Sequence, residues 1–195
     1  MFAQALRDLL AALGEQSPPP DWPGDLRAAA RHALRGRPAR DEWFAPLVRA
    51  AVYDPNPSYN RRLIEPALKA FGRRRVQAAV LDYLRTGTNA ERAGAARAWY
   101  WTQAPLTYIG RSPTPTPESQ AEYDAVAGLR QQWRDAALHL FVSTDDLGLR
   151  RQLLPGLDLR TAHYPAELRE TVAQAIHIAR THPDEYLRHR VEQQI

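Results

Sequence analysis

The feature that most constrains this chain is a succession of segments in which apolar residues recur at helical spacing and which end at proline or glycine. In the first of these, Phe2, Leu6, Leu9 and Leu13 fall on one face of a helix. Segments of this kind are expected at residues 2–13, 21–34, 41–53, 58–71, 73–86, 89–101, 117–142, 145–154, 165–181 and 183–194. Credible strands are missing, so the chain is predicted to be all-α.

Prolines mark the boundaries of these helices. Residues 54–58 read Asp-Pro-Asn-Pro-Ser and predict a tight turn, because each proline disfavours the α conformation in the residue before it. Pro66 is expected to bend its helix or to remove a hydrogen bond from it. Residues 104–117 are predicted to be an extended, polyproline-like loop. Thr116 and Pro117 then suit the cap and first position of a new helix.

Composition limits the class of protein. The 195 residues are 44% hydrophobic and 25% charged, which is typical of a folded chain that can bury one continuous core. The sequence has no cysteine, which excludes disulfides and thiolate metal sites. No apolar stretch approaches the roughly 20 residues that span a bilayer, and residues 2–13 suit an amphipathic helix better than a signal peptide. We therefore expect a soluble, cytoplasmic protein that does not bind membranes.

Four of the expected helices begin in the same way. In each, a turn or capping residue opens a short helix that carries arginine in its first two turns, and a more apolar helix precedes it. These openings start at Pro57, Asn89, Asp145 and Pro183. The more apolar helices that precede them cover residues 41–53, 73–86, 117–143 and 165–181. Repeat periods near 40 residues are typical of α-solenoids built from helix pairs.

This alternation resembles the HEAT-repeat and armadillo-like family, in which an outer helix, a tight turn and an inner helix stack on their neighbours. The resemblance covers residues 41–194, with degenerate motifs and with the proline-rich loop at 104–117 inserted in the middle. It implies a single domain over residues 1–195, with a short right-handed α-solenoid preceded by an N-terminal helical cap at residues 1–40. An irregular helical bundle is the alternative.

The candidate binding residues are mostly arginines. A solenoid exposes a concave surface of successive inner helices, which here would present six arginines to an acidic partner. These are Arg61, Arg62, Arg92, Arg150, Arg151 and Arg188. Arg73, Arg74 and Arg75 follow Gly72 at an expected helix start, where positive charge opposes the helix dipole. This cluster fits either an anionic partner or a solvated edge paired with Glu65 or Asp82.

Three consecutive aromatic residues form a second candidate. Successive helical residues point about 100° apart, so Trp99, Tyr100 and Trp101 cannot all face one core. One ring is expected to contact a ligand, a base or a partner, with Arg97 one turn before it. The alternative is that the loop at 104–117 folds back over that ring.

These patterns favour a non-enzymatic interaction or scaffold protein that binds an acidic protein or peptide. The alternative is a nucleic-acid-binding protein, because some HEAT-like proteins are DNA glycosylases that excise alkylated bases. No catalytic residue, cofactor or metal is predicted, and no phosphate loop, nucleophile elbow or zinc-protease motif is present. His182, Glu185 and His189 have a spacing that can hold a metal, but arginines interleave them and solvated side chains are favoured.

Overall fold

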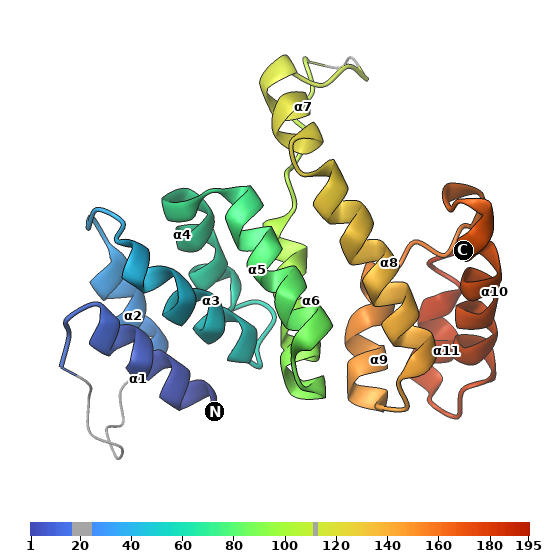
Figure 1. The fold of residues 1–195 in the computed structure, drawn as a ribbon, viewed down its shortest axis with the longest axis horizontal. Helices are drawn as coiled ribbons and strands as arrows, with labels where there is room; N and C mark the ends of the chain where they lie inside the picture. The colour runs from blue at the N-terminus through green and yellow to red at the C-terminus, as the bar shows by residue number, and fades with distance from the viewer. Residues whose placement is uncertain (17–24, 111–112) are drawn as a thin grey trace. The chain divides into compact units, whose positions relative to one another are not determined.

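The computed structural model describes residues 1–16, 25–110 and 113–195, and it confirms that this part of the chain is all-α, without a strand. Three short 3-10 turns accompany its α-helices (Figure 1). The α-helices are α1 (Phe2–Ala12), α2 (Leu26–Leu34), α3 (Phe44–Tyr53), α4 (Arg61–Phe71), α5 (Arg73–Thr86), α6 (Asn89–Thr102), α7 (Pro117–Asp124), α8 (Ala127–Ser143), α9 (Leu147–Leu153), α10 (Ala166–Thr181) and α11 (Glu185–Val191). The 3-10 turns are Asp41–Trp43, Leu154–Gly156 and Thr161–His163.

The chain divides into two compact units. The first comprises residues 1–80 and 97–126, and the second comprises residues 81–96 and 127–195. One domain over residues 1–195, with a cap at 1–40, therefore stays a prediction.

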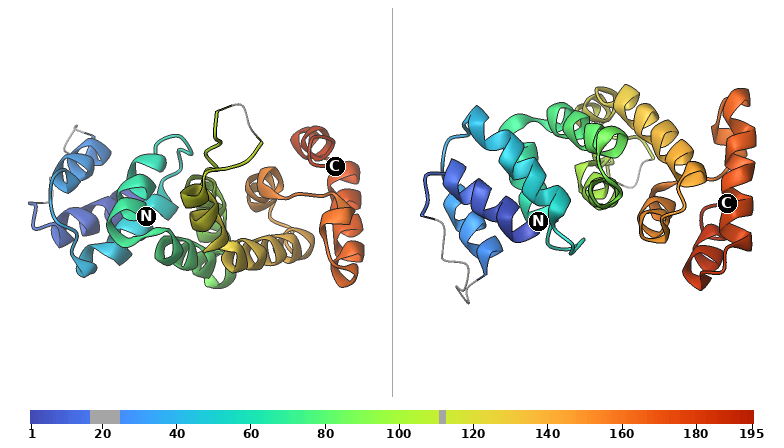
Figure 2. Two further views of the ribbon diagram at one scale, coloured as in Figure 1. Left: turned by 90° about the horizontal axis from the view of Figure 1, so that it is seen from above. Right: turned by 60° about the horizontal axis from the view of Figure 1, so that its bottom comes forward.

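The core of the first unit forms where α3 packs against both α1 and α4 (Figures 1 and 2). Leu6 and Leu9 of α1, Leu47 of α3, and Leu63 and Ile64 of α4 are all buried. Each such side chain contributes about 1.5–3 kcal/mol of burial free energy. The helical spacing of apolar residues in the sequence thus coincides with the buried faces.

In the second unit, α10 packs against α8 and α11. Leu138 and Phe141 of α8, Val172 of α10 and Leu187 of α11 are fully buried there. Among the described residues of the whole chain, no helix is long and apolar enough to cross a membrane.

Several helix boundaries in the structure differ from those predicted from the sequence. The single helix expected over 117–142 is two helices, because the chain turns at Ala125 and Val126, and Val126 is buried. The loop before it closes on itself through Ile109 N–H to Thr114 O and Thr116 N–H to Thr107 O, at 3.2 and 2.7 Å. Tyr108 and Pro115 form an isolated antiparallel bridge there. The helix start predicted between residues 21 and 24 lies outside the described residues.

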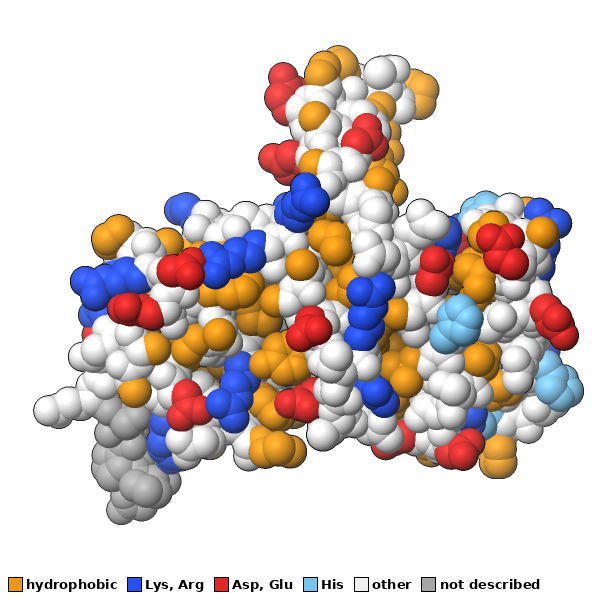
Figure 3. All heavy atoms as spheres, viewed as in Figure 1, with side chains coloured by type: hydrophobic (Ala, Val, Ile, Leu, Met, Phe, Trp, Pro, Cys, Tyr) orange, Lys and Arg blue, Asp and Glu red, His pale blue; other side chains and the backbone are white. Residues whose placement is uncertain are grey.

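Two other predictions concern single positions. Pro66 does not end α4, which continues to Phe71 and stops at Gly72, where φ is 80°. Thr116 caps α7 through the Ser119 N–H, as its position predicted. No described residue of α7 is buried, and Figure 3 shows acidic and hydrophobic side chains on this helix.

One arrangement of aspartates recurs at the starts of second helices. Asp54 lies in the turn between α3 and α4 and is fully buried. Its carboxylate accepts the Asn56 N–H at 2.9 Å and two bonds from the Arg27 guanidinium of α2, both at 2.8 Å. A bidentate arginine–carboxylate pair is among the stronger polar contacts in proteins.

Asp146 and Asp184 repeat this arrangement before α9 and α11. Asp146 caps α9 through the Leu149 N–H at 2.8 Å and also accepts the Asn89 amide at 3.2 Å. Asp184 caps α11 through the Leu187 N–H at 3.2 Å and pairs with both ends of the Arg151 guanidinium of α9. Asp54, Asp146 and Asp184, called the turn aspartates below, each join their own turn to a helix that precedes it in the sequence.

Asp54→Asn tests this arrangement. The substitution removes the charge of a fully buried carboxylate and leaves the partly exposed Arg27 guanidinium without its counterion, so it is expected to destabilise the fold by about 2–4 kcal/mol. Urea unfolding followed by circular dichroism measures the change.

Asp41→Asn is the matched control, because Asp41 also pairs with an arginine, Arg75, but its side chain is 81% exposed. Solvent-exposed ion pairs contribute little to stability, so this variant should unfold like the wild type. Equal losses of unfolding free energy in the two variants would show that the burial of Asp54 does not determine the stability of its ion pair.

Candidate functional site

Two open hollows flank α4 in the first unit. One lies between α2 and α4 and has a volume of 480 Å³; the other lies between α4 and the end of α6 and has a volume of 610 Å³. Glu65 and Lys69 line both, so the hollows form one continuous surface, which we call the basic groove. Its cationic side chains are Arg31, Arg35, Arg61, Arg62, Lys69 and Arg73.

The spacing of residues explains why these cations face outward. On α2, Arg31 and Arg35 are four residues apart, so they share one face, while Ala30 and Ala33 are buried. On α4, Arg61, Glu65 and Lys69 follow the same spacing opposite the buried face of the helix. The amphipathic period that buries the core therefore also builds the groove.

The groove is strongly positive because few of its cations have acidic partners. Glu65 is the acidic side chain among the described residues that line it, and it accepts a bond from Arg61 Nε at 2.6 Å. Within the described ranges, Arg31, Arg35 and Lys69 have no ion-pair partner. Clustered charges of one sign raise the local concentration of anionic ligands.

The three consecutive aromatic residues separate as the helix geometry requires. Trp99 is buried, whereas Tyr100 is 70% exposed and lines the groove. Trp101 donates its Nε1–H to Pro57 O at 2.7 Å, and the Arg61 guanidinium lies 5.1 Å from its ring centre. The residue with the outward ring is thus Tyr100. The loop at 104–117 leaves it largely uncovered.

The three arginines of the cluster at residues 73–75 make different contacts. Arg73 donates to Thr102 O and Gln103 O, at 2.5 and 2.7 Å, and so caps the C-terminal end of α6. Arg75 pairs with Asp41 and holds the pKa of that carboxyl below its usual value.

Arg75 also lies 4.1 Å from the ring centre of Phe44. Arg74 is exposed and has no ion-pair partner in the part of the chain that the structure describes. The pairing expected with Glu65 or Asp82 is replaced by pairing with Asp41.

The remaining predicted arginines contact their own unit. Arg92 donates to Arg85 O at 3.2 Å. Arg97 is partly buried, and this burial lowers the pKa of its guanidinium, an effect that the charge of Asp54 opposes.

In the second unit, Arg150 is buried with its Nε donating to Phe141 O, and Arg151 pairs with Asp184. Arg188 donates to the carbonyls of His182 and Pro183. Arg61, Arg62, Arg73 and Trp101 are therefore the predicted residues that the structure brings together in the groove.

Arg31, Arg35 and Lys69 also line the groove, and sequence reasoning missed them, whereas Tyr100, which lines it too, belongs to the predicted aromatic triplet. The spacing of Arg31 and Arg35 marks an exposed helix face, but only the packing of α2 beside α4 gives that face a neighbour. Tyr100 was recognisable as one member of an aromatic triplet. The residues of that triplet predicted to bind a partner were its neighbours, Trp99 and Trp101.

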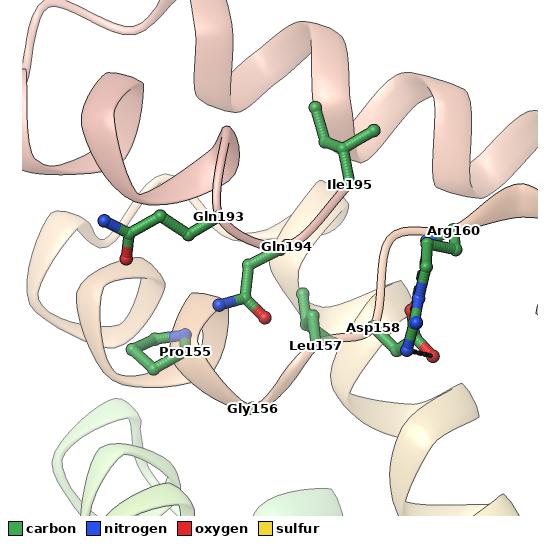
Figure 4. Close-up of a pocket in the computed structure, with 8 residues that line it drawn as sticks. All are labelled: Pro155, Gly156, Leu157, Asp158, Arg160, Gln193, Gln194 and Ile195. Carbon is green, nitrogen blue, oxygen red and sulfur yellow. Dashed lines mark hydrogen bonds and ion pairs between the residues drawn. The ribbon is translucent and has the colours of Figure 1, made fainter.

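A further hollow, of 360 Å³, lies in the second unit between residues 155–160 and 193–195 (Figure 4). Its carboxylate, Asp158, accepts two bonds from Arg160, at 2.8 and 3.0 Å, and contacts His163 Nδ1 at 2.6 Å. These contacts, the Arg160 bond above all, hold the pKa of Asp158 well below its usual range. Asp158 is thus occupied and offers no free base.

The described residues contain no cluster of side chains that could bind a metal ion. No group of three or more histidine, aspartate or glutamate side chains among the described residues could hold a metal ion. His182 Nδ1 accepts the Asp184 N–H at 3.0 Å, and His189 lies 3.6 Å from Glu185. These contacts place the histidines in the local structure of the last helix.

The described part of the chain is all-α, and its first unit carries a basic, partly aromatic groove. Comparison of the chain with models of protein families, with curated proteins and with solved structures finds no match.

Asp158→Asn is expected to lower stability at neutral pH by about 1 kcal/mol, because it removes a carboxylate that two cationic groups stabilise. The folded-state pKa is depressed, so this contribution is complete above the unfolded pKa of about 4. It declines as the pH falls toward the folded pKa and is lost below it. Urea unfolding at pH 7, 4 and 3 measures the difference between the variant and the wild type.

Asp145→Asn is the control for the pH series, since Asp145 is fully exposed and its nearest cationic atom, of Arg150, is 3.7 Å away. It should match the wild type at each pH. An Asp158→Asn difference that stays constant from pH 7 to 3 would contradict the assigned pKa direction.

Proposed function

We propose that the protein is a non-catalytic cytoplasmic scaffold of HEAT-like helix pairs, stacked as a short right-handed solenoid, and that its basic groove binds an acidic segment of a partner protein. The proposal has two parts, the stacking and the ligand. Separate observations support them.

The turn aspartates support the stacking. In a stack of helix pairs, the second helix of one pair neighbours the second helix of the next. Asp184 joins the start of α11 to α9, and Asp146 joins the start of α9 to the first residue of α6. Asp54 joins the turn before α4 to α2 in the same manner. A repeated contact of this type favours repeated units over an irregular bundle.

The observation that carries the ligand assignment is the set of groove cations without counterions. Most arginines of the predicted site contact carboxylates or carbonyl oxygens of their own unit, so these contacts stabilise the fold. Arg31, Arg35 and Lys69 serve no such contact within the described chain, yet they gather on one surface. An acidic segment would supply the missing charge, and arginine forks suit its carboxylates.

The openness of the groove favours a peptide over a small anion. Its cations come from exposed faces of α2 and α4, and they are spread along the helices, not converging on one point. A small ion would contact one or two of them. An extended acidic chain would contact several at once, which raises both the association rate and the affinity at low salt.

The Arg31→Glu/Arg35→Glu double variant tests the groove. Binding of a fluorescein-labelled peptide of about ten residues, mostly glutamate, is followed by fluorescence anisotropy at low and physiological salt. Charge reversal is expected to weaken binding at least tenfold, about 1.4 kcal/mol. Wild-type binding should weaken with salt, since screening acts on exposed charges.

Arg40→Glu/Arg74→Glu is the matched control, because it makes the same change of charge at exposed positions outside the groove. It should bind within about twofold of the wild type after the general charge effect is included. No wild-type binding at low salt would remove the proposed ligand, and equal losses in both double variants would remove the proposed location.

Nucleic-acid binding is the second candidate, and the exposed Tyr100 ring favours it. Proteins that bind single-stranded nucleic acids combine a basic groove with aromatic side chains on which bases stack. Glu65, the groove's carboxylate, already pairs with Arg61, so we assign it no part in base excision. Competition of an oligothymidine with the labelled peptide separates the two. Displacement at concentrations well below those of unlabelled peptide would favour the nucleic acid.

A further inference from the structure

The two hollows of the basic groove differ in chemistry. The hollow between α2 and α4 is lined mainly by the cations Arg31, Arg35, Arg62 and Lys69. The hollow between α4 and α6 is also lined by cations, Arg61, Lys69 and Arg73, and it adds the aromatic rings of Tyr100 and Trp101 beside Leu68 and Pro105. A ligand that carries only carboxylates would leave this aromatic surface in water.

The aromatic part of the second hollow is held in place by contacts within the unit. Trp101 is fixed by its bond to Pro57 O, and Tyr100 meets the Trp101 ring edge-on at 4.8 Å, with an angle of 89° between the rings. Arg73 caps the end of the helix that carries both rings. A ligand ring would therefore meet a surface whose side chains are already ordered, which reduces the entropy lost on binding.

An aromatic side chain fits this surface better than other groups. It would cover the exposed ring of Tyr100 and the Leu68 and Pro105 side chains, and aromatic rings bury about 150–250 Å² each. The Arg61 guanidinium, 5.1 Å from the Trp101 ring centre, adds a cation beside the same surface. The 610 Å³ volume of the hollow is within the range of sites that take such groups.

The groove also sets the distance between the two kinds of ligand residue. The hollows lie on either side of α4, and a helix with its side chains is about 10 Å across. An extended chain covers that distance in about three residues, at roughly 3.3 Å each. Glu65 borders both hollows, so an acidic residue at the crossing would meet a like charge.

We infer that the segment recognised by the groove carries an aromatic residue about three positions from a run of acidic residues, with uncharged residues between them. The acidic run lies over Arg31, Arg35 and Arg62, and the aromatic ring lies against Tyr100. This inference rests on the proposed function, and it specifies the ligand class of the same site.

Three labelled peptides of about fifteen residues test it by fluorescence anisotropy. All carry the same glutamate run; the first has no aromatic residue, the second has a tryptophan about three residues beyond the run, and the third has it about eight residues beyond. The second peptide is expected to bind the wild-type protein about tenfold more tightly than the other two.

Tyr100→Ala should abolish this tenfold difference, and Tyr100→Phe should keep it, because the ring and not the hydroxyl makes the contact. Tyr100 is 70% exposed, so both variants should fold, and their thermal unfolding is measured to verify this. Equal binding of the three peptides to the wild type would overturn the inference and leave the proposed function standing. Binding of none would remove the proposed function itself.

Discussion

The structure depends on how the backbone N–H groups at the start of each second helix are satisfied, because the first N–H groups of a helix have no partner within it. Asp146 and Asp184 satisfy such groups at α9 and α11, and Asp54 accepts an N–H of the turn that precedes α4. Asp54, Asp146 and Asp184 each accept a backbone N–H of their own turn and a side-chain donor from an earlier helix. A local capping preference thus becomes a contact between elements that are 27 to 57 residues apart in sequence. The ends of the helices and their packing are fixed together.

This constraint determines which arginines are available to a ligand. Arg27 and Arg151 are the donors to turn aspartates, and Arg73 caps α6 through carbonyl oxygens. Such arginines stabilise the chain and are poor candidates for recognition. The cations of α2 and α4 that lack partners stand out against them, so the groove is identified by what the fold leaves unpaired. Counting arginines in the sequence could not separate the two groups.

The sequence predicted the helices well because their signal is local. The period of apolar residues gave α1, α3 and α4, and capping residues gave the starts of α7 and α9. The break between α7 and α8 was missed, since residues around Ala125 favour helix and only tertiary packing buries Val126. The groove was half predicted. Arg61 and Arg62 could be predicted from the pattern of one helix. Arg31 and Arg35 line the groove only because α2 lies beside α4, and the pattern of a single helix does not show which helix lies beside it.

Glu65 gives the groove a polarity that a uniform basic patch lacks. Its pairing with Arg61 neutralises the centre of the surface, so unpaired positive charge is concentrated on the α2 side, whereas the aromatic rings lie on the α6 side. A ligand with evenly spaced charges, such as a nucleic-acid backbone, would place a phosphate near Glu65. A peptide can vary its side chains residue by residue and so match both ends. The arrangement of charge around α4, more than its total, therefore favours a protein ligand.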